Sequence, residues 1–257
     1  MITFPRTRVE LRMEGRNPLV SSPNLAILYN NGQSYTRHVV GPNGDKCEWF
    51  AFMPRTFVDA MRSYKPGIEE YDPQLFDLNC VFLSKELFLL QRVLVEHISQ
   101  PVVDQWWVDE ASLRILDGLC HTHAELTGKE SSTVRNETRN AHRELAREAQ
   151  RLLVERYDQH VTLESISAEL HTSPFHLARI FRQQLGLTLH RYLEQLRLRM
   201  AVERLPDYAH NLTHLALEVG YTSHSHFSQA FRRVFGLPPS RMSYQAALEQ
   251  LQPRAVI

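Results

Sequence analysis

The amino-acid sequence predicts an α+β protein of two domains: a β-rich N-terminal domain with trailing helices, and an all-α C-terminal domain. Three observations carry this prediction. Short apolar or alternating runs between turn signals fill residues 1 to about 80. Apolar residues at helical spacing dominate the remainder. One stretch near the C-terminus occurs twice, which predicts two helix-turn-helix units joined by a linker helix.

The β-rich part contains several candidate strands close together. Residues 8–13 alternate between polar and apolar side chains, 25–29 form a short apolar run, and 47–53 are rich in aromatic residues. Turn signals at 30–32 and 41–45 separate them. Strands at such short spacing predict a small sandwich or barrel.

Two helices are expected after the strands. Ser84 is a candidate N-cap for the first, which Pro101 ends, and the second covers about 109–126. Each has an apolar face that either packs on the β-rich part or forms a homodimer. The residues of these faces are Leu87, Leu90, Leu94 and Ile98 in the first helix and Leu113 and Leu116 in the second.

A polar stretch at 127–138 marks the expected boundary between domains at 1–126 and 139–257. Helix resumes near 139 and runs to about 157, followed by a short helix at 162–170. The linker helix at 189–205, at ~1.5 Å per residue, is about 25 Å long. With half of each flanking unit added, the outer helices would lie about 34 Å apart, one turn of DNA.

The repeated stretch has a fixed offset of 50 residues, since the segment from Ser223 aligns with the segment from Ser173. Helix caps, core positions and outer polar positions are all in register, which predicts two copies of one supersecondary unit. The identical pairs are Ser173/Ser223, His176/His226, Phe181/Phe231, Arg182/Arg232, Gly186/Gly236 and Leu187/Leu237.

The second copy shows how such a unit is built. Gly220 can end the preceding helix in a left-handed conformation, and Ser223 can cap the next one. The buried stripe of that helix is expected to be Phe227, Ala230, Phe231 and Val234. Its opposite face carries hydrogen-bonding groups and no acid: His224, Ser225, Ser228, Gln229 and Arg232. This layout suits a helix in a DNA major groove, so double-stranded DNA is the expected partner.

Charge is balanced over the whole chain but not evenly distributed. The formal net charge is zero, and no lysine occurs after Lys129. Between residues 151 and 245 there are eleven arginines against eight acidic residues. Because arginine suits bidentate phosphate and guanine contacts, this half is adapted to a polyanion.

A set of apolar, aromatic, glycine, serine, proline and arginine residues is spread over the C-terminal half. Its members are Leu163, Ile166, Ser173, Leu177, Arg179, Phe181, Gly186, Tyr192, Arg197, Ala201, Ala216, Val219, Gly220, Tyr221, Phe227, Phe231, Arg232, Gly236 and Pro239. With this set, residues from about 150 to 242 resemble the DNA-binding domain of the AraC/XylS family of bacterial transcription regulators. The resemblance implies base-contacting positions on the first and second recognition helices, phosphate or core-edge roles for the arginines, and RNA polymerase as a further partner. The candidate DNA-contacting residues are Phe175, His176, Ala178, Arg179, Arg182, His224, Ser225, Ser228, Gln229 and Arg232.

The sequence departs from the family pattern in a few places. Arg204 replaces a usual leucine and Pro206 follows, so the linker helix is expected to stop early. Gln229 stands where many members have arginine, which shifts the expected base preference from guanine towards adenine.

For the N-terminal domain, the resemblance implies a cupin-like sensing and dimerising domain. The metal motif of a cupin is absent, because His38 has no histidine partner, so no metal or other cofactor is expected. The Cys-His-Thr-His run at 120–123 invites a zinc hypothesis, but no second ligand pair has suitable spacing. A metal-free effector pocket is one interpretation of the aromatic residues here, and ordinary core packing is the other. The candidate effector-binding residues are Tyr35, Arg37, Trp49, Phe50 and Phe52.

Other protein classes find little support. Three widely spaced cysteines do not form a disulfide framework, and no phosphate loop, nucleophile elbow or zinc-hydrolase motif occurs, so no enzyme is expected. The chain does not open with a signal peptide, and the most apolar stretch, 81–98, is interrupted by charges. A cytoplasmic location with no membrane partner is the expectation.

The sequence therefore predicts a sequence-specific transcriptional regulator that reads two adjacent major grooves, most simply an activator that responds to a small-molecule effector. Two alternatives stay open. The regulator is controlled by a protein partner with no small-molecule ligand, or it acts as a repressor.

Overall fold

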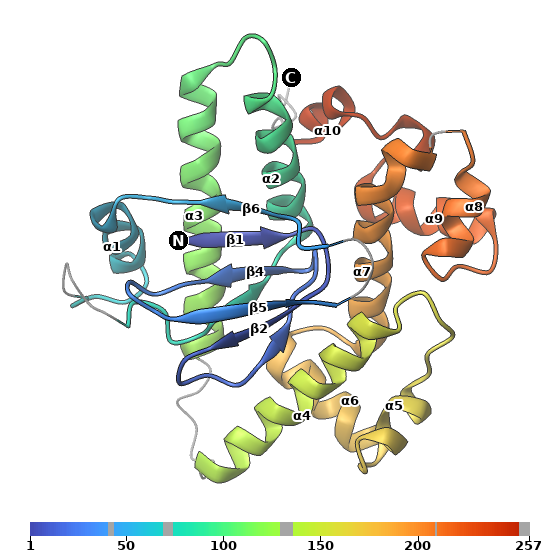
Figure 1. The fold of residues 1–257 in the computed structure, drawn as a ribbon, viewed down its shortest axis with the longest axis horizontal. Helices are drawn as coiled ribbons and strands as arrows, with labels where there is room; N and C mark the ends of the chain where they lie inside the picture. Colours follow the sequence, from blue (N-terminus) through green and yellow to red (C-terminus); the bar gives the residue numbers. More distant parts are fainter. Residues whose placement is uncertain (41–43, 69–73, 129–135, 209, 252–257) are drawn as a thin grey trace, which may run out of the picture.

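The computed structural model describes residues 1–40, 44–68, 74–128, 136–208 and 210–251. The first third of the chain forms two small antiparallel sheets, and the last half consists of helices (Figure 1). The expected α+β organisation is therefore confirmed.

Four strands form the larger sheet, in the order β6-β1-β4-β7. They are β1 (Ile2–Pro5), β4 (Leu25–Leu28), β6 (Cys47–Phe50) and β7 (Cys80–Phe82). The smaller sheet has the order β3-β2-β5, from β2 (Val9–Met13), β3 (Leu19–Val20) and β5 (Tyr35–Val39). All pairings are antiparallel, and Ile2 of the central strand β1 lies opposite Leu28 on one side and Phe50 on the other.

The inner strands β1 and β4 of the larger sheet are buried along their whole length, on both of the faces to which successive side chains point. In β4, Ala26 and Leu28 belong to the main core, which also contains the apolar faces of the helices. Leu25 and Ile27, on the opposite face of the same strand, pack with Leu11 of the smaller sheet in a second cluster. The N-terminal half is thus layered as helices, larger sheet and smaller sheet.

Three helices cover the outer face of the larger sheet: α1 (Pro54–Arg62), α2 (Lys85–Ile98) and α3 (Gln105–Gly128) (Figure 1). Ser84 caps α2 as expected, because its Oγ accepts a hydrogen bond from the Leu87 amide at 3.1 Å. Gly118 allows α2 and α3 to approach closely, since a Cβ atom there would lie 2.8 Å from Cδ2 of Leu87.

The apolar stripe of α2 was one candidate for a dimer face, and this assignment is wrong. Leu90 and Leu94 are only 3% and 2% exposed, because they face the core of the same chain. Leu116 of α3 is likewise buried, whereas Ile98 at the end of α2 and Leu113 of α3 remain about half exposed. Amphipathicity identified only part of the buried face of each helix, and it did not show what covers that face. The homodimer itself stays a prediction.

The C-terminal half follows the expected order of helices. Its elements are α4 (Asn136–Glu155), α5 (Leu163–Glu169), α6 (Pro174–Leu185), α7 (Leu189–Arg204), η1 (Leu205–Tyr208), α8 (Leu212–Glu218), α9 (His224–Phe235), η2 (Pro239–Arg241) and α10 (Tyr244–Leu251). Helix α3 ends at Gly128 and α4 begins at Asn136, so most of the expected linker at 127–138 lies outside the described residues.

Charged side chains join the two halves. Arg8, just before β2, donates to the carbonyl of Glu155 at 2.9 Å and so satisfies the C-terminal end of α4. Glu203 of α7 pairs with Arg6 at 2.5 Å and with Arg92 at 3.4 Å. Among the described helices, none combines the length and apolar composition that a bilayer crossing requires.

Candidate nucleic-acid interface

Two short helix pairs in the C-terminal half have matching caps at both ends of their second helix. In α6, Ser173 Oγ accepts from the His176 amide at 3.1 Å, and Gly186 ends the helix with φ of 75°. In α9, Ser223 Oγ accepts from the His226 amide at 3.3 Å, and Gly236 ends it with φ of 79°. The sequence repeat at an offset of 50 residues therefore corresponds to two helices, α6 and α9, with the same N-cap and C-cap structure.

The turns before these two helices differ by one residue. A backbone hydrogen bond between residues five positions apart closes each turn. In the first turn the Thr172 amide donates to the Ser167 carbonyl at 3.0 Å, and in the second the Tyr221 amide donates to the Ala216 carbonyl at 2.9 Å. Both turns contain a left-handed residue, His171 with φ of 51° in the first and Gly220 with φ of 85° in the second. Equivalent residues of the two turns, such as His171 and Gly220, are 49 positions apart, whereas the N-caps Ser173 and Ser223 are 50 apart. The second unit therefore has one more residue between its turn and its N-cap.

Burial separates an inner and an outer face on both helices. The inner faces are fully buried and consist of Leu177, Ile180 and Phe181 in α6 and of Phe227, Ala230, Phe231 and Phe235 in α9. The outer faces carry the candidate DNA-contacting residues. Phe175 is 79% exposed, and Arg179, Arg182, His224, Ser225, Gln229 and Arg232 are exposed as well. Ala178 and Ser228 are half-buried.

The arginines of the two outer faces have no counter-ion in the part of the chain that the structure describes. Within the described ranges, neither Arg179, Arg182 nor Arg232 forms an ion pair or a side-chain hydrogen bond. Nearby acids are neutralised by other arginines: Glu169 by Arg156 at 2.7 Å and Glu218 by Arg204 at 3.1 Å. Free guanidinium groups on the two outer faces favour a polyanionic partner.

Two histidines of the candidate set have neighbours that limit their freedom. The ring of His176 is half-buried and packs edge-on against His142 of α4, with centroids 5.7 Å apart. Partial burial, together with the nearby His176 and Arg179, lowers the pKa of His142. On α9, His224 Nε2 lies 3.2 Å from Ser228 Oγ, so these two side chains act as one polar group.

Helix α7 stands between the two units and fixes their positions (Figure 1). Its Arg197 donates to the carbonyls of Tyr157 and Gln159 at 2.6 and 2.7 Å and lies over the Tyr221 ring. Gly220 packs against the same carbonyl, since a Cβ atom there would lie 2.8 Å from the Tyr157 oxygen. As expected, α7 stops at Arg204, before Pro206. The linker helix α7, the segment that follows α4 and the second helix-turn-helix unit therefore pack against one another at a single junction.

Comparison with known proteins agrees with this geometry. A family model described as "Helix-turn-helix domain" matches residues 166–244, which include both turns, both outer faces and α7. These residues form an AraC-type helix-turn-helix domain.

Curated relatives share this region of the chain. "Probable transcriptional regulator LumQ" of Photobacterium leiognathi is 34% identical over 99 residues, 36% of this chain and 40% of LumQ. "HTH-type transcriptional activator RhaS" of Escherichia fergusonii is 37% identical over 87 residues, 34% of this chain and 31% of RhaS. "Bifunctional transcriptional activator/DNA repair enzyme AdaA" of Bacillus subtilis is 29% identical over 94 residues, 37% of this chain and 44% of AdaA. The matches thus span less than half the length of these relatives.

Outside the helix-turn-helix domain, the candidate effector residues do not all meet at one place. Tyr35 and Phe52 line a cavity of about 380 Å³ together with Tyr29, Phe57 and Phe76. Arg37 reaches the edge of this group, where its Nη1 lies 3.2 Å from the Tyr29 hydroxyl while Asp45 holds its other nitrogens.

The two remaining effector candidates lie apart from the cavity. Phe50 packs edge-on against Phe4, with ring centroids 5.0 Å apart, and Trp49 is 64% exposed. The sequence missed Tyr29, Phe57 and Phe76, which come from three separate segments.

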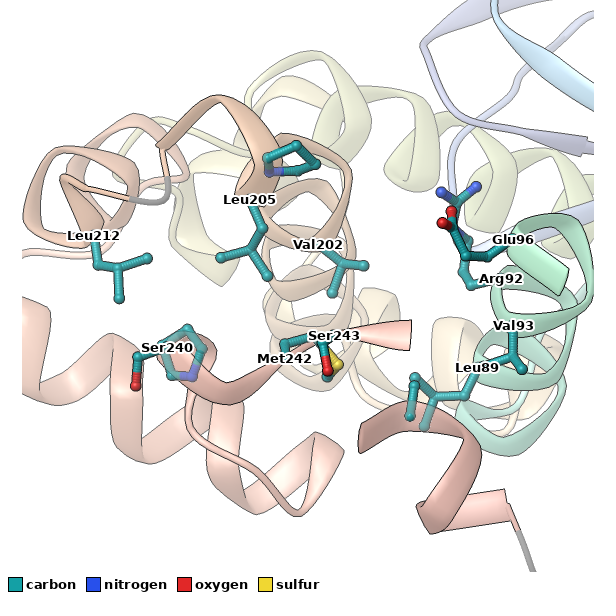
Figure 2. Close-up of a pocket in the computed structure, with 13 residues that line it drawn as sticks. Leu89, Arg92, Val93, Glu96, Val202, Leu205, Leu212, Ser240, Met242 and Ser243 are labelled. Carbon is teal, nitrogen blue, oxygen red and sulfur yellow. The ribbon is translucent and has the colours of Figure 1, made fainter. Parts of the chain in front are cut away.

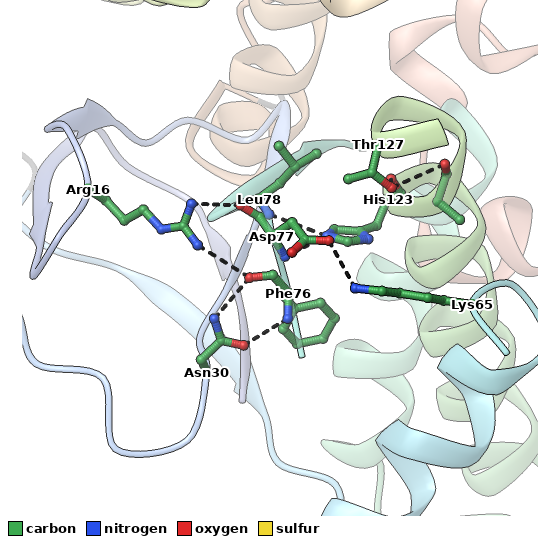
Figure 3. A network of polar contacts seen from close by, with 9 residues as sticks. Arg16, Asn30, Lys65, Phe76, Asp77, Leu78, His123 and Thr127 are labelled. Atoms are coloured by element: carbon green, nitrogen blue, oxygen red, sulfur yellow. Dashed lines mark hydrogen bonds and ion pairs between the residues drawn. The ribbon is translucent and has the colours of Figure 1, made fainter. Parts of the chain in front are cut away.

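A polar network holds the segment that bounds this cavity, residues 74–79 (Figure 3). Asn30 forms a reciprocal pair with the Phe76 backbone, both hydrogen bonds being 2.9 Å long. His123 Nε2 accepts from the amides of Asp77 and Leu78 at 3.1 and 3.3 Å. His123 is therefore a backbone acceptor, and within the described residues no group of three or more metal-ligating side chains occurs.

None of the three cysteines is an activated thiol. Burial raises the pKa of all three thiols. The pKa of Cys80 rises to about 11 and that of Cys120 to about 12, and the pKa of Cys47 is also raised. Each is therefore a neutral thiol near neutral pH, which disfavours nucleophilic chemistry.

Sequence reasoning also missed Arg199 of α7, which is fully buried at the junction of the two halves. Its guanidinium donates to the Leu83 carbonyl at 2.7 Å and to the Pro23 carbonyl at 3.3 Å, and it lies between the rings of Phe82 and Phe88. Burial lowers its pKa to about 9. A local hydrogen bond to Gln195 Oε1 at 3.0 Å does not reveal its burial, because the two carbonyls that hold it at the junction are more than 100 positions away.

Proposed function

We propose that the chain is a sequence-specific DNA-binding regulator of transcription, in which α6 and α9 enter two successive major grooves. The observation that carries this proposal is the pair of matched outer faces, which are exposed, free of acid and supplied with unpaired arginines. The 16 residues of α7, at ~1.5 Å each, separate the units by about 24 Å. Half the width of each unit brings the recognition helices to about 34 Å, one turn of DNA.

The two units should read different bases, because equivalent positions carry different side chains. Arg179 of α6 corresponds to Gln229 of α9, and Phe175 corresponds to Ser225. An arginine at such a position pairs with guanine, whereas glutamine pairs with adenine. Arg182 and Arg232 occupy the same place in both units, which suits contacts to phosphate. The operator is therefore expected to be asymmetric.

The N-terminal half, taken as residues 1–126, is proposed as the sensing and dimerising domain. Its aromatic cavity has a volume within the range of small-molecule sites. RhaS and AdaA are described as transcriptional activators, which favours activation with RNA polymerase as a partner. Control by a protein partner, or repression, is the alternative. Such a regulator would act in the cytoplasm, as a homodimer and without a catalytic step; the neutral cysteines support the last point.

Salt dependence tests the DNA-binding proposal directly. We expect the affinity of the full chain for DNA to fall steeply between about 50 and 200 mM salt, because arginine contacts to phosphate release counter-ions. Fluorescence anisotropy with a labelled duplex at several salt concentrations measures the slope. Binding that does not change over this range would contradict the proposal.

The effect of a substitution on base preference distinguishes the proposed roles of Arg179 and Arg232. Arg179→Ala is expected to relax the preference at one base pair by ~1–3 kcal/mol, whereas Arg232→Ala should weaken all sequences alike and reduce the salt slope by about 1. Binding to a panel of single-base operator variants measures both effects. A uniform loss for Arg179→Ala would show that this residue contacts phosphate instead of a base.

A further inference from the structure

A groove at the junction of the two halves has no part in the DNA contacts proposed above. Its volume is about 380 Å³, within the range of small-molecule sites. One wall is α2, and the other consists of the end of α7 with η1, the start of α8, η2 and the first turn of α10 (Figure 2). A molecule in this groove would touch the N-terminal half and the second helix-turn-helix unit at the same time.

The walls of the groove are mainly apolar. Leu89 and Val93 come from α2, and Val202, Leu205 and Met242 face them from the C-terminal half (Figure 2). Such walls suit a hydrocarbon or aromatic body, because contact removes apolar surface from water on both sides.

Among the described residues that line the groove, the two charged ones, Arg92 and Glu96, belong to α2 and are one helical turn apart. Arg92 is already neutralised: its Nη1 lies 3.2 Å from Glu48 and its Nε 3.4 Å from Glu203. Arg6 contacts the same two carboxylates, at 3.2 Å and 2.5 Å. Two arginines therefore balance two glutamates, and this cluster offers no surplus charge to a ligand.

Glu96 is different, because its charge is not balanced. The residue is exposed at the groove, and its carboxylate accepts a 3.4 Å hydrogen bond from the Gln100 amide. Across the described ranges of the chain, no arginine, lysine or histidine nitrogen lies within ion-pairing distance of it. The groove thus combines an apolar interior with one free negative charge.

We propose that this groove binds a small organic cation, whose apolar body fills the space between α2 and α7 and whose protonated amine pairs with Glu96. The site is separate from the aromatic cavity of the N-terminal half, and it does not depend on the DNA contacts. Because both halves supply walls, a cation that binds only their docked arrangement stabilises it by RT ln(1 + [L]/Kd), where [L] is the free cation concentration and Kd its dissociation constant.

Three probes of equal chain length test the charge preference in the full-length protein: n-octylamine, octan-1-ol and octanoate, each titrated by isothermal calorimetry at neutral pH. We expect saturable binding of one octylamine, about three- to fivefold tighter than octanol, as is typical of one partly exposed ion pair. Octanoate should bind more weakly than octanol, because Glu96 repels it. Tighter binding of octanoate would overturn the proposal and assign the site to Arg92.

Two variants locate the binding. Glu96→Gln should abolish the preference for octylamine and leave octanol within about twofold, since the exposed carboxylate makes no structural ion pair. Glu14→Gln removes the same charge at an exposed position outside the groove and should change nothing. Val202→Phe narrows the groove and should weaken all three probes. If the octylamine preference survives Glu96→Gln, or no probe binds at all, the proposal is wrong.

Discussion

Gly220→Ala is expected to destabilise the C-terminal half by about 2–5 kcal/mol, the sum of left-handed backbone strain and a steric clash. The backbone at this residue has φ of 85°, and the new Cβ atom would lie 2.8 Å from the Tyr157 carbonyl and 3.0 Å from Arg197 Nε. Both contacts belong to the rigid junction of α4, α7 and the second unit. Urea denaturation followed by circular dichroism measures the loss.

Gly186→Ala is the matched control, because this glycine has a similar φ of 75° but no atom within 4 Å of the added Cβ. It should lose only the strain, about 1–2 kcal/mol. The difference between the two variants isolates the clash at the junction. Equal losses would mean that the contact of Gly220 with Tyr157 has no energetic importance.

Arg199→Ala is expected to cost about 3–5 kcal/mol and to loosen the contact between the two halves, since it creates a cavity and leaves two carbonyls without a donor. The space lies between Phe82 and Phe88, whose ring centroids are 5.1 and 4.9 Å from the guanidinium carbon. The carbonyls are those of Leu83 and Pro23. Thermal unfolding and limited proteolysis of the full chain measure the two consequences.

Two comparisons show which part of Arg199 matters. Arg199→Met keeps most of the packing and loses only the donors, so its loss should be smaller than that of Arg199→Ala. Arg191→Ala, at an exposed position of the same helix, should change stability by less than about 0.5 kcal/mol. A loss for Arg191→Ala as large as for Arg199→Ala would show that helix content, and not the junction, is responsible.

Local sequence signals predicted the helix-turn-helix units well. Ser173 and Ser223 cap their helices, and Gly186 and Gly236 end them, because capping depends on residues within one turn. Exposure of the outer faces follows from the same periodicity. These features need no knowledge of the rest of the chain.

Contacts between distant segments were beyond the sequence. Arg6 and Glu203 are 197 residues apart, and nothing local indicates that they pair or that Arg199 is buried. Strand β1 was missed for a related reason. It has only four residues, which is too short a run to show a clear periodicity, and its burial comes from the neighbouring strands β4 and β6 and from the layers on both faces. The aromatic cavity also joins segments whose meeting only the fold determines.

The spacing of the DNA site tests the central claim most directly. Selection of duplexes from a random library by the full-length protein should yield two dissimilar blocks whose centres lie about 10–11 base pairs apart. Because α7 holds both units rigidly, inserting either about 5 or about 10 base pairs between the blocks should lower affinity about tenfold or more. A single conserved block, or affinity that is unchanged by both insertions, would contradict the reading of two successive grooves by one chain.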